Sequence, residues 1–530
     1  MRARNLLSRR FRWLILSLSL SSLRAAVAPA AVETNSANDF PNELTVTGGV
    51  IRGRTLPSGE GAVFKGIPFA QPPVGELRWR EPKPVAPWKG IREATESGPP
   101  AAQGSFGWND RFAKASREDC LYLDVWTPAK RTSERLPVMV WIHGGSNTAG
   151  AGGADNLYQG GVIVRRGVVL VLIEYRVGLF GFFAHPELTR ESPHHSSGNY
   201  GLLDQIAALR WVRENIAKFG GDPNHVTLFG QSAGSMDIMS LIASPLARGL
   251  FQRAIAESGP APFGGMTGTL TEAEHAGEET AAELKAPKEN TLAYLRSLPA
   301  ETLVSAKSKV LPLCVDGWIL PTIPSSAFLA GKETAVPLLI GSNAIEFPWG
   351  GSSVPQMKKT VSGIFSQLTP KAFTAYGLDA ASPSVSDPLY GTKAEQIGSD
   401  LFRCASIVQG EAHEAAGNAV WEYEFARPIP GHKQVAHSGE IPYVFGNLRP
   451  DGDLGGNFTE ADRELSAAMQ AYWTNFAKTG NPNSVELPKW PAFNGKTRSY
   501  LQFTPAAKVS VGENQRAPYA ELYRELLRAP

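Results

Sequence analysis

The sequence predicts an α/β fold in which a mostly parallel sheet carries helices on both faces. Five short runs are apolar throughout, as suits strands that are buried on both faces of a sheet. Between the second and third run, residues 200–219 place apolar side chains at intervals of three and four, which is typical of a helix. Strands that alternate with helices indicate an α/β fold. The runs lie at 136–143, 168–173, 226–229, 254–256 and 336–340.

Other segments predict how the rest of the chain is arranged. Residues 44–53 alternate like a hairpin with Gly48-Gly49 as its turn, and the proline-rich stretch 64–79 is expected to be an ordered surface loop. Regions 259–305 and 350–401 have few long apolar runs, and we interpret them as insertions that could cover an active site. Because the pieces of one site are spread over most of the chain, we expect residues 31–530 to form a single catalytic domain.

Composition excludes some functions. With 42% hydrophobic residues the chain can build a large core, and a net charge of +2 gives no electrostatic reason to expect nucleic acid as a partner. Cys120, Cys314 and Cys404 allow at most one disulfide, and their spacing does not indicate a metal site. The alternative is that all three are small buried hydrophobic residues.

Residues 1–30 resemble a secretory signal. A basic segment, 1–12, is followed by a short apolar run, 13–23, and by an alanine-rich stretch, 25–31, with small residues where cleavage would occur. The apolar run is too short to span a membrane. We therefore expect export to the periplasm or beyond, with the signal removed. A disordered basic arm is the alternative, and Ser8-Arg9-Arg10 only partly matches a twin-arginine signal.

The strongest chemical signal is the G-x-S-x-G pattern at 230–234. Such a pattern turns a strand sharply into a helix and holds a serine in a strained conformation with its hydroxyl exposed. An apolar run precedes it, and a largely apolar stretch that ends near Ser244-Pro245 follows it. We expect Ser232 to be a catalytic nucleophile; the alternative is a purely structural glycine-rich turn.

A serine hydroxyl needs a neighbouring base, which a third group orients. In sheets with this turn the acid and then the histidine follow the serine along the chain, and three histidines follow the best acid candidate, Glu346. His413 is expected on an exposed helical face and His432 in a proline-rich turn. Small residues follow His437 and permit close approach to another loop, so His437 ranks first.

The acid should lie on a loop that follows a core strand. Glu346 comes five residues after the expected strand end at Gly341, and Asp316 is the second candidate. The alternative for Glu346 is an ordinary solvated loop carboxylate.

Acyl transfer also needs backbone N–H groups that point at the developing oxyanion. Ala233, after the serine, would supply one, and the glycine-rich loop after the first long strand would supply the others from Gly145 and Ser146. His143 ends that strand but precedes the serine, so we interpret it as a structural hydrogen-bonding residue rather than as the base.

Together these segments resemble the type-B carboxylesterase family, which includes the cholinesterases, over nearly the whole chain after residue 30. The resemblance implies an α/β-hydrolase fold, a triad of Ser232, Glu346 and His437, and hydrolysis of small-molecule carboxylic esters without cofactor or metal. The matching blocks lie at 64–75, 118–126, 141–145, 198–205, 219–223, 230–234, 437–445 and 472–483.

Four positions depart from the family pattern. Gln231 replaces a usual glutamate and removes a negative charge from the pocket, which argues against a choline ester as the preferred substrate. Ser146 replaces the third glycine of the oxyanion loop and narrows the site for bulky alcohol groups. Cys120 matches a family cysteine whose usual partner would fall near Ala101, so that disulfide is expected to be absent. Glu174 replaces a usual asparagine, and the sequence offers no physical reason for this.

The competing class is a non-catalytic binding protein, because this fold also serves as a scaffold when the triad is lost. All three triad residues are present here, which favours an enzyme. Among enzymes an amidase, a lipase and a specialised ester-toxin hydrolase remain open. A lipase should carry a large apolar lid, and the two expected insertions are too polar to favour one.

Overall fold

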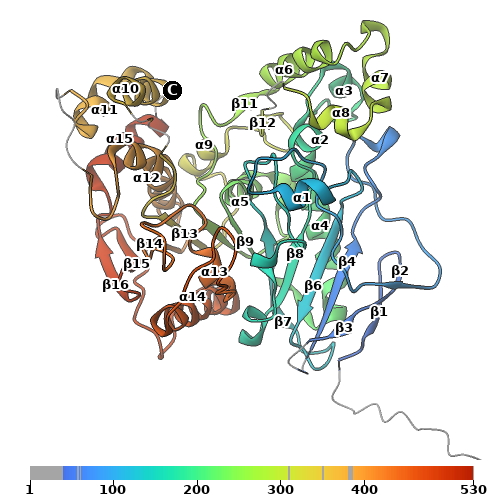
Figure 1. Ribbon diagram of the computed structural model, residues 1–530, viewed down its shortest axis with the longest axis horizontal. Coiled ribbons are helices and arrows are strands. Elements are labelled where there is room, and N and C mark those ends of the chain that lie inside the picture. The colour runs from blue at the N-terminus through green and yellow to red at the C-terminus, as the bar shows by residue number, and fades with distance from the viewer. Residues whose placement is uncertain are drawn as a thin grey trace, which may run out of the picture. The chain divides into compact units, whose positions relative to one another are not determined.

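The protein, described as a computed structural model, is organised around a mixed sheet of 11 strands within the described residues (Figure 1). In spatial order these strands are β16 (Val509–Glu513), β15 (Ser499–Phe503), β14 (Val420–Phe425), β13 (Leu338–Asn343), β10 (Arg253–Glu257), β9 (Gly221–Gln231), β7 (Leu136–Ile142), β8 (Val169–Ile173), β6 (Tyr122–Thr127), β4 (Ala62–Pro68) and β3 (Arg54–Thr55). From β15 to β8 neighbouring strands are parallel, and the outer pairs are antiparallel.

The structure describes most of the chain. The segment at 1–30 that is predicted to be a signal lies outside the described residues, and the described residues belong to one compact unit, Asn38–Pro530. The assignment of 31–530 to a single catalytic domain stays a prediction. The described residues are 40–56, 59, 61–307, 311–348, 351, 353–379 and 386–528.

The five predicted strands are confirmed and lie side by side as β8, β7, β9, β10 and β13. Some boundaries differ, since β9 begins at Gly221 and not at Val226, and β13 ends at Asn343 and not at Gly341. Leu136 of β7 pairs with Gly221 and Val138 pairs with Val226, so the turn-forming residues between them make an irregularity within the strand. A bulge accommodates extra residues in this way without ending the strand.

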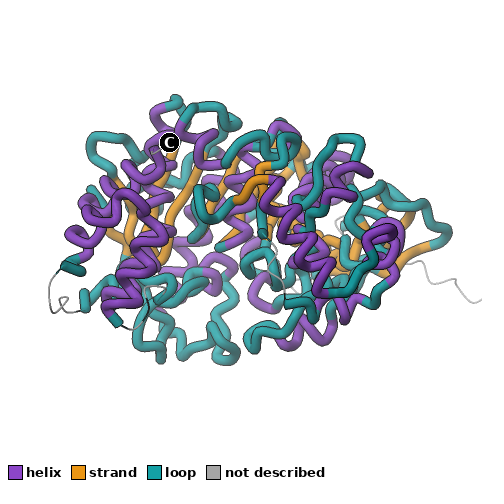
Figure 2. Tube along the Cα trace, turned by 90° about the horizontal axis from the view of Figure 1, so that it is seen from above, coloured by secondary structure: helices purple, strands orange, loops and turns teal. Residues whose placement is uncertain are grey.

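Helices cover the sheet on both sides (Figure 2). The predicted helix at 200–219 is confirmed as α4 and a final 3₁₀ turn, and the expected helix after the serine is α5. None of the described helices is long and apolar enough to cross a membrane. The α-helices are α1 (Asp110–Ala115), α2 (Gly178–Phe182), α3 (Pro186–Glu191), α4 (Tyr200–Asn215), α5 (Ala233–Ala243), α6 (Leu270–Glu283), α7 (Thr291–Ser297), α8 (Ala300–Val304), α9 (Pro324–Leu329), α10 (Val354–Phe365), α11 (Thr369–Tyr376), α12 (Lys393–Ala415), α13 (Ile441–Phe445), α14 (Glu460–Thr479) and α15 (Ala517–Arg528). The 3₁₀ helices are η1 (Gly75–Leu77), η2 (Asn156–Tyr158), η3 (Ile163–Arg166), η4 (Ile216–Phe219), η5 (Pro245–Ala247), η6 (Lys288–Asn290) and η7 (Ser366–Leu368).

Alternation along β7 explains why both faces of the sheet are covered. Val140 and Ile142 pack in a core cluster with side chains of α4 and α5, whereas Met139 and Trp141 pack in a second cluster with side chains of α14. Successive side chains of a strand point to opposite faces, so a strand that is apolar throughout needs a helical layer on each side.

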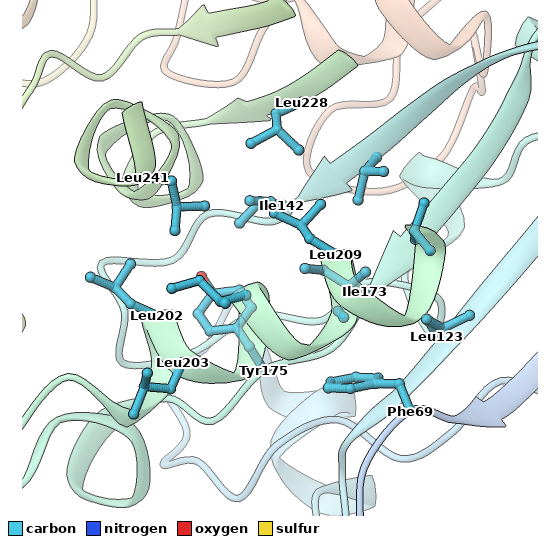
Figure 3. Close-up of a cluster of buried hydrophobic side chains, with 14 of the residues drawn as sticks. Phe69, Leu123, Ile142, Ile173, Tyr175, Leu202, Leu203, Leu209, Leu228 and Leu241 are labelled. Atoms are coloured by element: carbon cyan, nitrogen blue, oxygen red, sulfur yellow. The ribbon is translucent and has the colours of Figure 1, made fainter. Parts of the chain in front are cut away.

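Figure 3 shows part of the first cluster, where Leu202 and Leu209 of α4 lie among Ile142, Ile173 and Leu228 of the sheet. Burying each such side chain contributes about 1.5–3 kcal/mol to stability. This packing fixes the ends of β7, β8 and β9 relative to one another, and the candidate site is built at those ends.

One expectation about the first part of the chain is wrong. Residues 64–79 were expected to be a surface loop, yet β4 covers Ala62–Pro68, is mostly buried and pairs with β6. The pairing is irregular between Phe64 and Ile67, and Pro68 is the last residue of the strand. Proline is tolerated at strand ends and at bulges, so the proline content does not exclude a strand here.

Two small sheets complete the described strands. The predicted hairpin is confirmed as β1 (Glu43–Val46) and β2 (Gly49–Arg52), with Thr47 and Gly48 rather than Gly48 and Gly49 in the turn. β5 (Ile91–Glu93) joins this hairpin, and β11 (Gly268–Thr269) pairs with β12 (Cys314–Val315).

The regions interpreted as insertions are helical. The first contains α6, α7 and α8, and the second contains α10, α11 and the beginning of α12. α12 continues to Ala415, so a boundary near residue 401 would cut a continuous helix. In Figure 1, α10, α11 and α15 lie together beside α12.

Candidate active site

The serine turn lies where β9 ends at Gln231 and α5 begins at Ala233. Ser232, between them, has φ 58° and ψ −125°. Residues other than glycine rarely adopt these backbone angles, and holding a residue there costs about 1–3 kcal/mol. The Ser232 N–H donates to the Glu257 carbonyl of the neighbouring β10 at 2.9 Å, which helps to hold the turn. This is the strained strand-to-helix turn that the pattern predicts.

Both glycines of the pattern are required by the closeness of β7. A Cβ atom at Gly234 would lie 2.0 Å from the Ile142 carbonyl oxygen, and one at Gly230 would lie 2.5 Å from the same oxygen. A methyl group at either position would push the turn away from the end of β7. The spacing of the pattern therefore follows from the packing of β9 and α5 against β7.

Glu346 and His437 meet at the same edge of the sheet. Glu346 follows β13, is 4% exposed, and accepts a hydrogen bond from the Asn343 N–H at 2.7 Å through Oε1. Its Oε2 lies 2.5 Å from Nδ1 of His437, which comes from the loop before α13. A carboxylate at Nδ1 places the ring proton there and leaves the lone pair on Nε2. Glu346 is thus a buried, paired carboxylate and not a solvated one.

Side chains of α12 hold the loop that carries Glu346. The Glu346 N–H donates to Ser399 Oγ at 2.8 Å. Arg403 Nη2 donates to the carbonyls of Asn343 at 2.9 Å and Ala344 at 2.5 Å. Hydrogen bonds to a charged group are stronger than neutral ones, so this clamp fixes the turn between β13 and the carboxylate.

The Gln231 amide lies against the imidazole of His437. Its Nε2 is 3.1 Å from His437 Nε2 and 3.5 Å from His437 Nδ1, and in the part of the chain that the structure describes no hydrogen bond joins His437 to Ser232. The Phe347 ring packs on the imidazole with centroids 4.1 Å apart, and Phe402 lies at 5.8 Å. Aromatic rings therefore line the side of the imidazole that faces the α12 region.

The glycine-rich loop after β7 lies against the serine. A Cβ atom at Gly144 would lie 3.0 Å from Cβ of Ser232, and one at Gly145 would lie 2.0 Å from the Ala149 carbonyl oxygen. Gly145 has φ 115° and Ser146 has φ 57°. The structure thus brings the predicted oxyanion loop beside the predicted nucleophile, with Ser146 in a conformation that favours glycine.

Ala233 is the first residue of α5, and the first N–H groups of a helix have no partner within it. The end of the helix also carries a partial positive charge, which stabilises anions. An N–H at this position can therefore donate to an oxyanion formed beside Ser232.

A buried polar chain anchors the far end of the oxyanion loop. Asn147 Nδ2 donates to Asp237 Oδ1 at 2.8 Å, and Gln205 Nε2 donates to Asp237 Oδ2 at 2.6 Å. The Tyr175 hydroxyl donates to the His143 carbonyl at 2.8 Å, and its oxygen also lies 3.1 Å from Asn147 Oδ1. Burial raises the pKa of Asp237 to about 7. No motif in the sequence indicated this network.

The comparison with known families agrees with this geometry. The model of the carboxylesterase family matches residues 41–521. The chain belongs to the carboxylesterase family. It is therefore an esterase that acts on carboxylic esters, and the α/β-hydrolase expectation is confirmed.

Named relatives are esterases of bacteria and animals. The chain is 36% identical over 489 residues to a fumonisin B1 esterase of Sphingopyxis macrogoltabida. This alignment covers 89% of this chain and 87% of the relative. It is 33% identical to a human cocaine esterase, over 92% of this chain and 91% of the relative. A solved structure of a PNB esterase matches with a TM-score of 0.78 at 31% identity, over 91% of this chain and 99% of that chain.

In this esterase the structure shows what surrounds Glu174. His143 is buried, its Nδ1 lies 2.8 Å from the Gly144 carbonyl, and burial lowers its pKa to about 4, so the ring is neutral. Glu174 Oε1 accepts from the Gly152 N–H at 2.7 Å, and burial raises the pKa of Glu174 well above its usual value. Its Oε2 lies 3.8 Å from His143 Nε2. This distance is too long for a hydrogen bond, and neither atom has a hydrogen-bond partner among the described residues, so the structure does not explain the replacement of asparagine by glutamate.

A second buried acid lies behind the Glu346 and His437 pair and was missed by the sequence reasoning. Glu440 comes three residues after His437 and accepts from Asn343 Nδ2 at 2.6 Å and from Ser258 Oγ at 3.4 Å. Burial, and then the charge of Glu346, raise the pKa of Glu440 to about 7. Its place in the block at 437–445 was the available signal.

The other candidates serve different purposes. Asp316 Oδ1 accepts backbone N–H groups, including that of Ile319 at 2.9 Å, and so stabilises a turn. His413 was expected on an exposed helical face, but this was wrong, since it is fully buried and its Nδ1 lies 2.7 Å from Glu333 Oε1. A buried partner on another loop cannot be read from the spacing of one helix. His432 Nε2 contacts the Gly455 carbonyl at 3.0 Å.

A cleft of about 580 Å³ opens beside His437. Trp108, Tyr158 and Ile441 contribute apolar surface, and charged side chains of both signs also line the cleft. Among the described residues, no group of three or more His, Cys, Asp or Glu side chains is placed to hold a metal ion.

The cysteines are all buried and unpaired, as expected for Cys120. Burial raises the pKa of the Cys120, Cys314 and Cys404 thiols. Ala101, where the family partner of Cys120 would fall, is itself buried.

Proposed function

We propose that this esterase acts through an acyl-enzyme on Ser232, with His437 as general base and Glu346 as the acid that orients it. The observation that carries the proposal is the 2.5 Å contact between Glu346 Oε2 and His437 Nδ1. It leaves Nε2 as the proton acceptor, and the ring lies against Gln231, the residue that precedes Ser232 at the end of β9.

The reaction has two halves. In the first, Ser232 Oγ attacks the ester carbonyl while His437 Nε2 takes its proton; the imidazolium then protonates the leaving alcohol as the carbon–oxygen bond breaks. In the second, water gives a proton to His437 and attacks the acyl carbon. The imidazolium then returns a proton to Ser232 Oγ as the bond between Oγ and the acyl carbon breaks and the acid leaves. Glu346 stabilises the imidazolium in both halves.

The oxyanion of each half needs preorganised donors. The N–H groups of Gly145, Ser146 and Ala233 are the donors in this proposal, because the loop and the start of α5 both lie at Ser232. Removing one such donor typically lowers kcat by about 10²–10³-fold.

The direct test is the rate of hydrolysis of a short-chain nitrophenyl ester by Ser232→Ala. We expect a fall of at least about 10³-fold, because the nucleophile is lost. Ser235→Ala is a matched control, since that hydroxyl is buried in the same helix and donates to the Gly259 carbonyl. A wild-type rate in Ser232→Ala would overturn the proposal, and a fluorophosphonate should add its mass to the peptide containing Ser232 and to no other.

Substrate choice is a second proposal. Relatives named as a fumonisin B1 esterase and a cocaine esterase favour hydrolysis of ester toxins as a candidate activity. The neutral Gln231 argues against choline esters. Both points can be tested by measuring hydrolysis of a panel of esters that varies acyl length and alcohol bulk separately and includes fumonisin B1, cocaine and butyrylcholine. A preference for butyrylcholine would contradict the argument from Gln231.

We also propose that the protein is exported and that residues 1–30 are removed. The basic, apolar and alanine-rich order of residues 1–31 supports this. Intact mass and N-terminal sequencing of the protein from a periplasmic fraction should give a chain that begins near residue 30; an intact Met1 on protein retained in the cytoplasm would contradict it.

A further inference from the structure

A buried glutamine that the proposed mechanism does not use joins two loops of the site. The side-chain amide of Gln103 binds the backbone of Gly150 twice: its Nε2 donates to the Gly150 carbonyl at 2.7 Å, and its Oε1 accepts from the Gly150 N–H at 2.9 Å. Its second donor binds the Ala101 carbonyl and its second acceptor position binds Asn109 Nδ2, each at 2.9 Å. Gln103, 5% exposed, thus makes all four hydrogen bonds that a side-chain amide can form.

We propose that Gln103 is a positioning residue that fixes the oxyanion donors through Gly150 and the wall of the cleft through Asn109. This inference rests on the proposed function, because the donors belong to that mechanism. Gln103 touches neither Ser232 nor His437 in the described residues, so its effect on the reaction passes through the two loops that it joins.

Gly150 closes the loop that begins at Gly144. Its φ is 122°, and a Cβ atom there would lie 2.5 Å from the Gly144 carbonyl oxygen. The Ala149 N–H donates to the Gly145 carbonyl at 3.0 Å, and a Cβ atom at Gly145 would lie 2.0 Å from the Ala149 carbonyl oxygen. The two ends of the loop are therefore packed backbone against backbone, so a shift of Gly150 moves the N–H groups of Gly145 and Ser146.

The loop is held by its buried residues and not by the ones that carry the donors. Ser146 is exposed and Gly145 is partly exposed, whereas Asn147 and Gly150 are buried. Asn147 is anchored by Asp237, and Gly150 is anchored by Gln103. Without the glutamine amide, the N–H and the carbonyl of Gly150 would be buried without partners, which is unfavourable, so the end of the loop would shift.

A second connection runs from Gln103 to Trp108. Asn109 is fully buried, and its side chain makes two more hydrogen bonds to backbone groups of residues 104–109, at 2.7 and 2.8 Å, which close this segment into a turn. The neighbouring Trp108 lines the cleft beside His437 and is 51% exposed. Because Asn109 is held by Gln103, the same amide supports the turn that presents this ring to the cleft.

Other ties between the two loops are weaker. In the part of the chain that the structure describes, Cys120 is a free thiol, so no disulfide closes the segment that carries Trp108. Arg111 reaches Asp155, beyond Gly150, at 2.9 Å, but its side chain is half-exposed, and exposed ion pairs contribute little. The buried bonds of Gln103 are therefore the firm connection between this segment and the oxyanion loop.

The test is steady-state hydrolysis of a short-chain nitrophenyl ester by Gln103→Met, which keeps the length of the side chain and removes the amide. Loss of one oxyanion donor lowers kcat by about 10²–10³-fold, so we expect displaced donors to lower kcat by about tenfold or more, with a smaller change in KM. An alkyl trifluoromethyl ketone adds to Ser232 Oγ and places its oxygen where the oxyanion forms. Its inhibition constant should rise by the factor by which kcat/KM falls, because it resembles the transition state.

Gln159→Met is the matched control. The Gln159 amide also binds the backbone of the segment after β7, at the carbonyls of Gly153 and Asp155 at 3.0 and 2.9 Å, but beyond the oxyanion loop. This variant should lose stability in the same way and keep kcat and the inhibition constant within about twofold of wild type. A purely structural role for Gln103 would lower only the melting temperature, and that result, or equal losses of kcat in both variants, would overturn the proposal.

Two further variants complete the design. If Gln103→Met does not fold, Gln103→Asn replaces it, because an asparagine is one methylene too short to bind Gly150 and Asn109 together, and the same fall in kcat is expected. Ser232→Ala decides the proposed function separately. If Ser232→Ala is inactive while Gln103→Met keeps the wild-type kcat and inhibition constant, the nucleophile stands and the positioning role fails; a wild-type rate in Ser232→Ala would overturn both.

Discussion

Asp237→Asn should make the protein more stable above neutral pH and not below pH 4. Asp237 lies in α5, is fully buried, and is held by the amides of Asn147 and Gln205. Burial raises its pKa from the ordinary 3.8 to about 7. Between pH 3.8 and about pH 7 the folded state binds a proton at Asp237 that the unfolded state has lost. The stability of the wild-type protein therefore falls as the pH rises through this range, and the fall is complete above about pH 7.

The size of the effect follows from the shift. Each pKa unit corresponds to about 1.4 kcal/mol, so a shift of about three units costs about 4 kcal/mol once the folded group must ionise. Substitution by asparagine removes that cost. The buried Gln205 Oε1 has no hydrogen-bond partner among the described residues, so a turned Gln205 amide could accept from the new amide group while Asn147 keeps an acceptor.

The assay is guanidinium unfolding of wild type and Asp237→Asn at pH 5, 6, 7 and 8. The difference in free energy of unfolding should move in favour of the variant by about 3 kcal/mol from pH 5 to pH 8, because about two units of the shift fall in this range. Asp453→Asn, at an exposed position, controls for general charge effects. A difference that does not depend on pH would refute the reasoning, because Asp237 would then titrate as it does in the unfolded chain.

Three further predictions concern the site and the thiols. Glu346→Gln should lower kcat by about 10³–10⁴-fold with little change in KM, because an amide cannot stabilise the imidazolium; steady-state kinetics on a nitrophenyl ester measure this, and a fall below tenfold would contradict it. Ser146→Gly should raise the melting temperature, by relieving the φ of 57°, and should raise kcat/KM for tert-butyl relative to ethyl esters; an unchanged ratio would show that this side chain does not limit the alcohol site. Cys120, Cys314 and Cys404 should react with a thiol reagent only after unfolding, giving three thiols without reductant, and fewer than three would indicate a disulfide.

The sequence predicted the parts of the fold that depend on short-range pattern. Buried parallel strands must be apolar on both faces, and β7, β8, β10 and β13 were found for that reason. The turn at Ser232 was found because only small residues fit beside the Ile142 carbonyl. These constraints act within a few residues and therefore leave a visible mark on the sequence.

Features that depend on distant partners could not be found in this way. The burial of His413 depends on Glu333 and on the Val336 carbonyl, which lie 80 and 77 residues earlier. The contact between Gln231 and His437 joins residues 206 apart. A pattern within one segment carries no information about such pairs, so Gln231 could be predicted as a pocket residue, but its contact with His437 could not.

The proline content of residues 64–79 led to the wrong expectation of a loop at β4, because composition alone does not separate a strand that ends in proline from a loop. The pairing of Glu346 with His437 could be predicted in part. The order of residues along the chain limited the candidates, and the family resemblance favoured Glu346 over Asp316.

The clamp that α12 places on the Glu346 turn bears on how relatives could be recombined. Ser399 and Arg403 belong to the same helix that continues from the second predicted insertion, and both bind the backbone that carries the carboxylate. A chimera that exchanges residues 350–401 for those of another esterase would replace Ser399 but keep Arg403. The two side chains that hold the Glu346 turn would then come from different proteins. Crossovers placed after Ala415 would transfer the helix whole and are the ones expected to keep the acid in place.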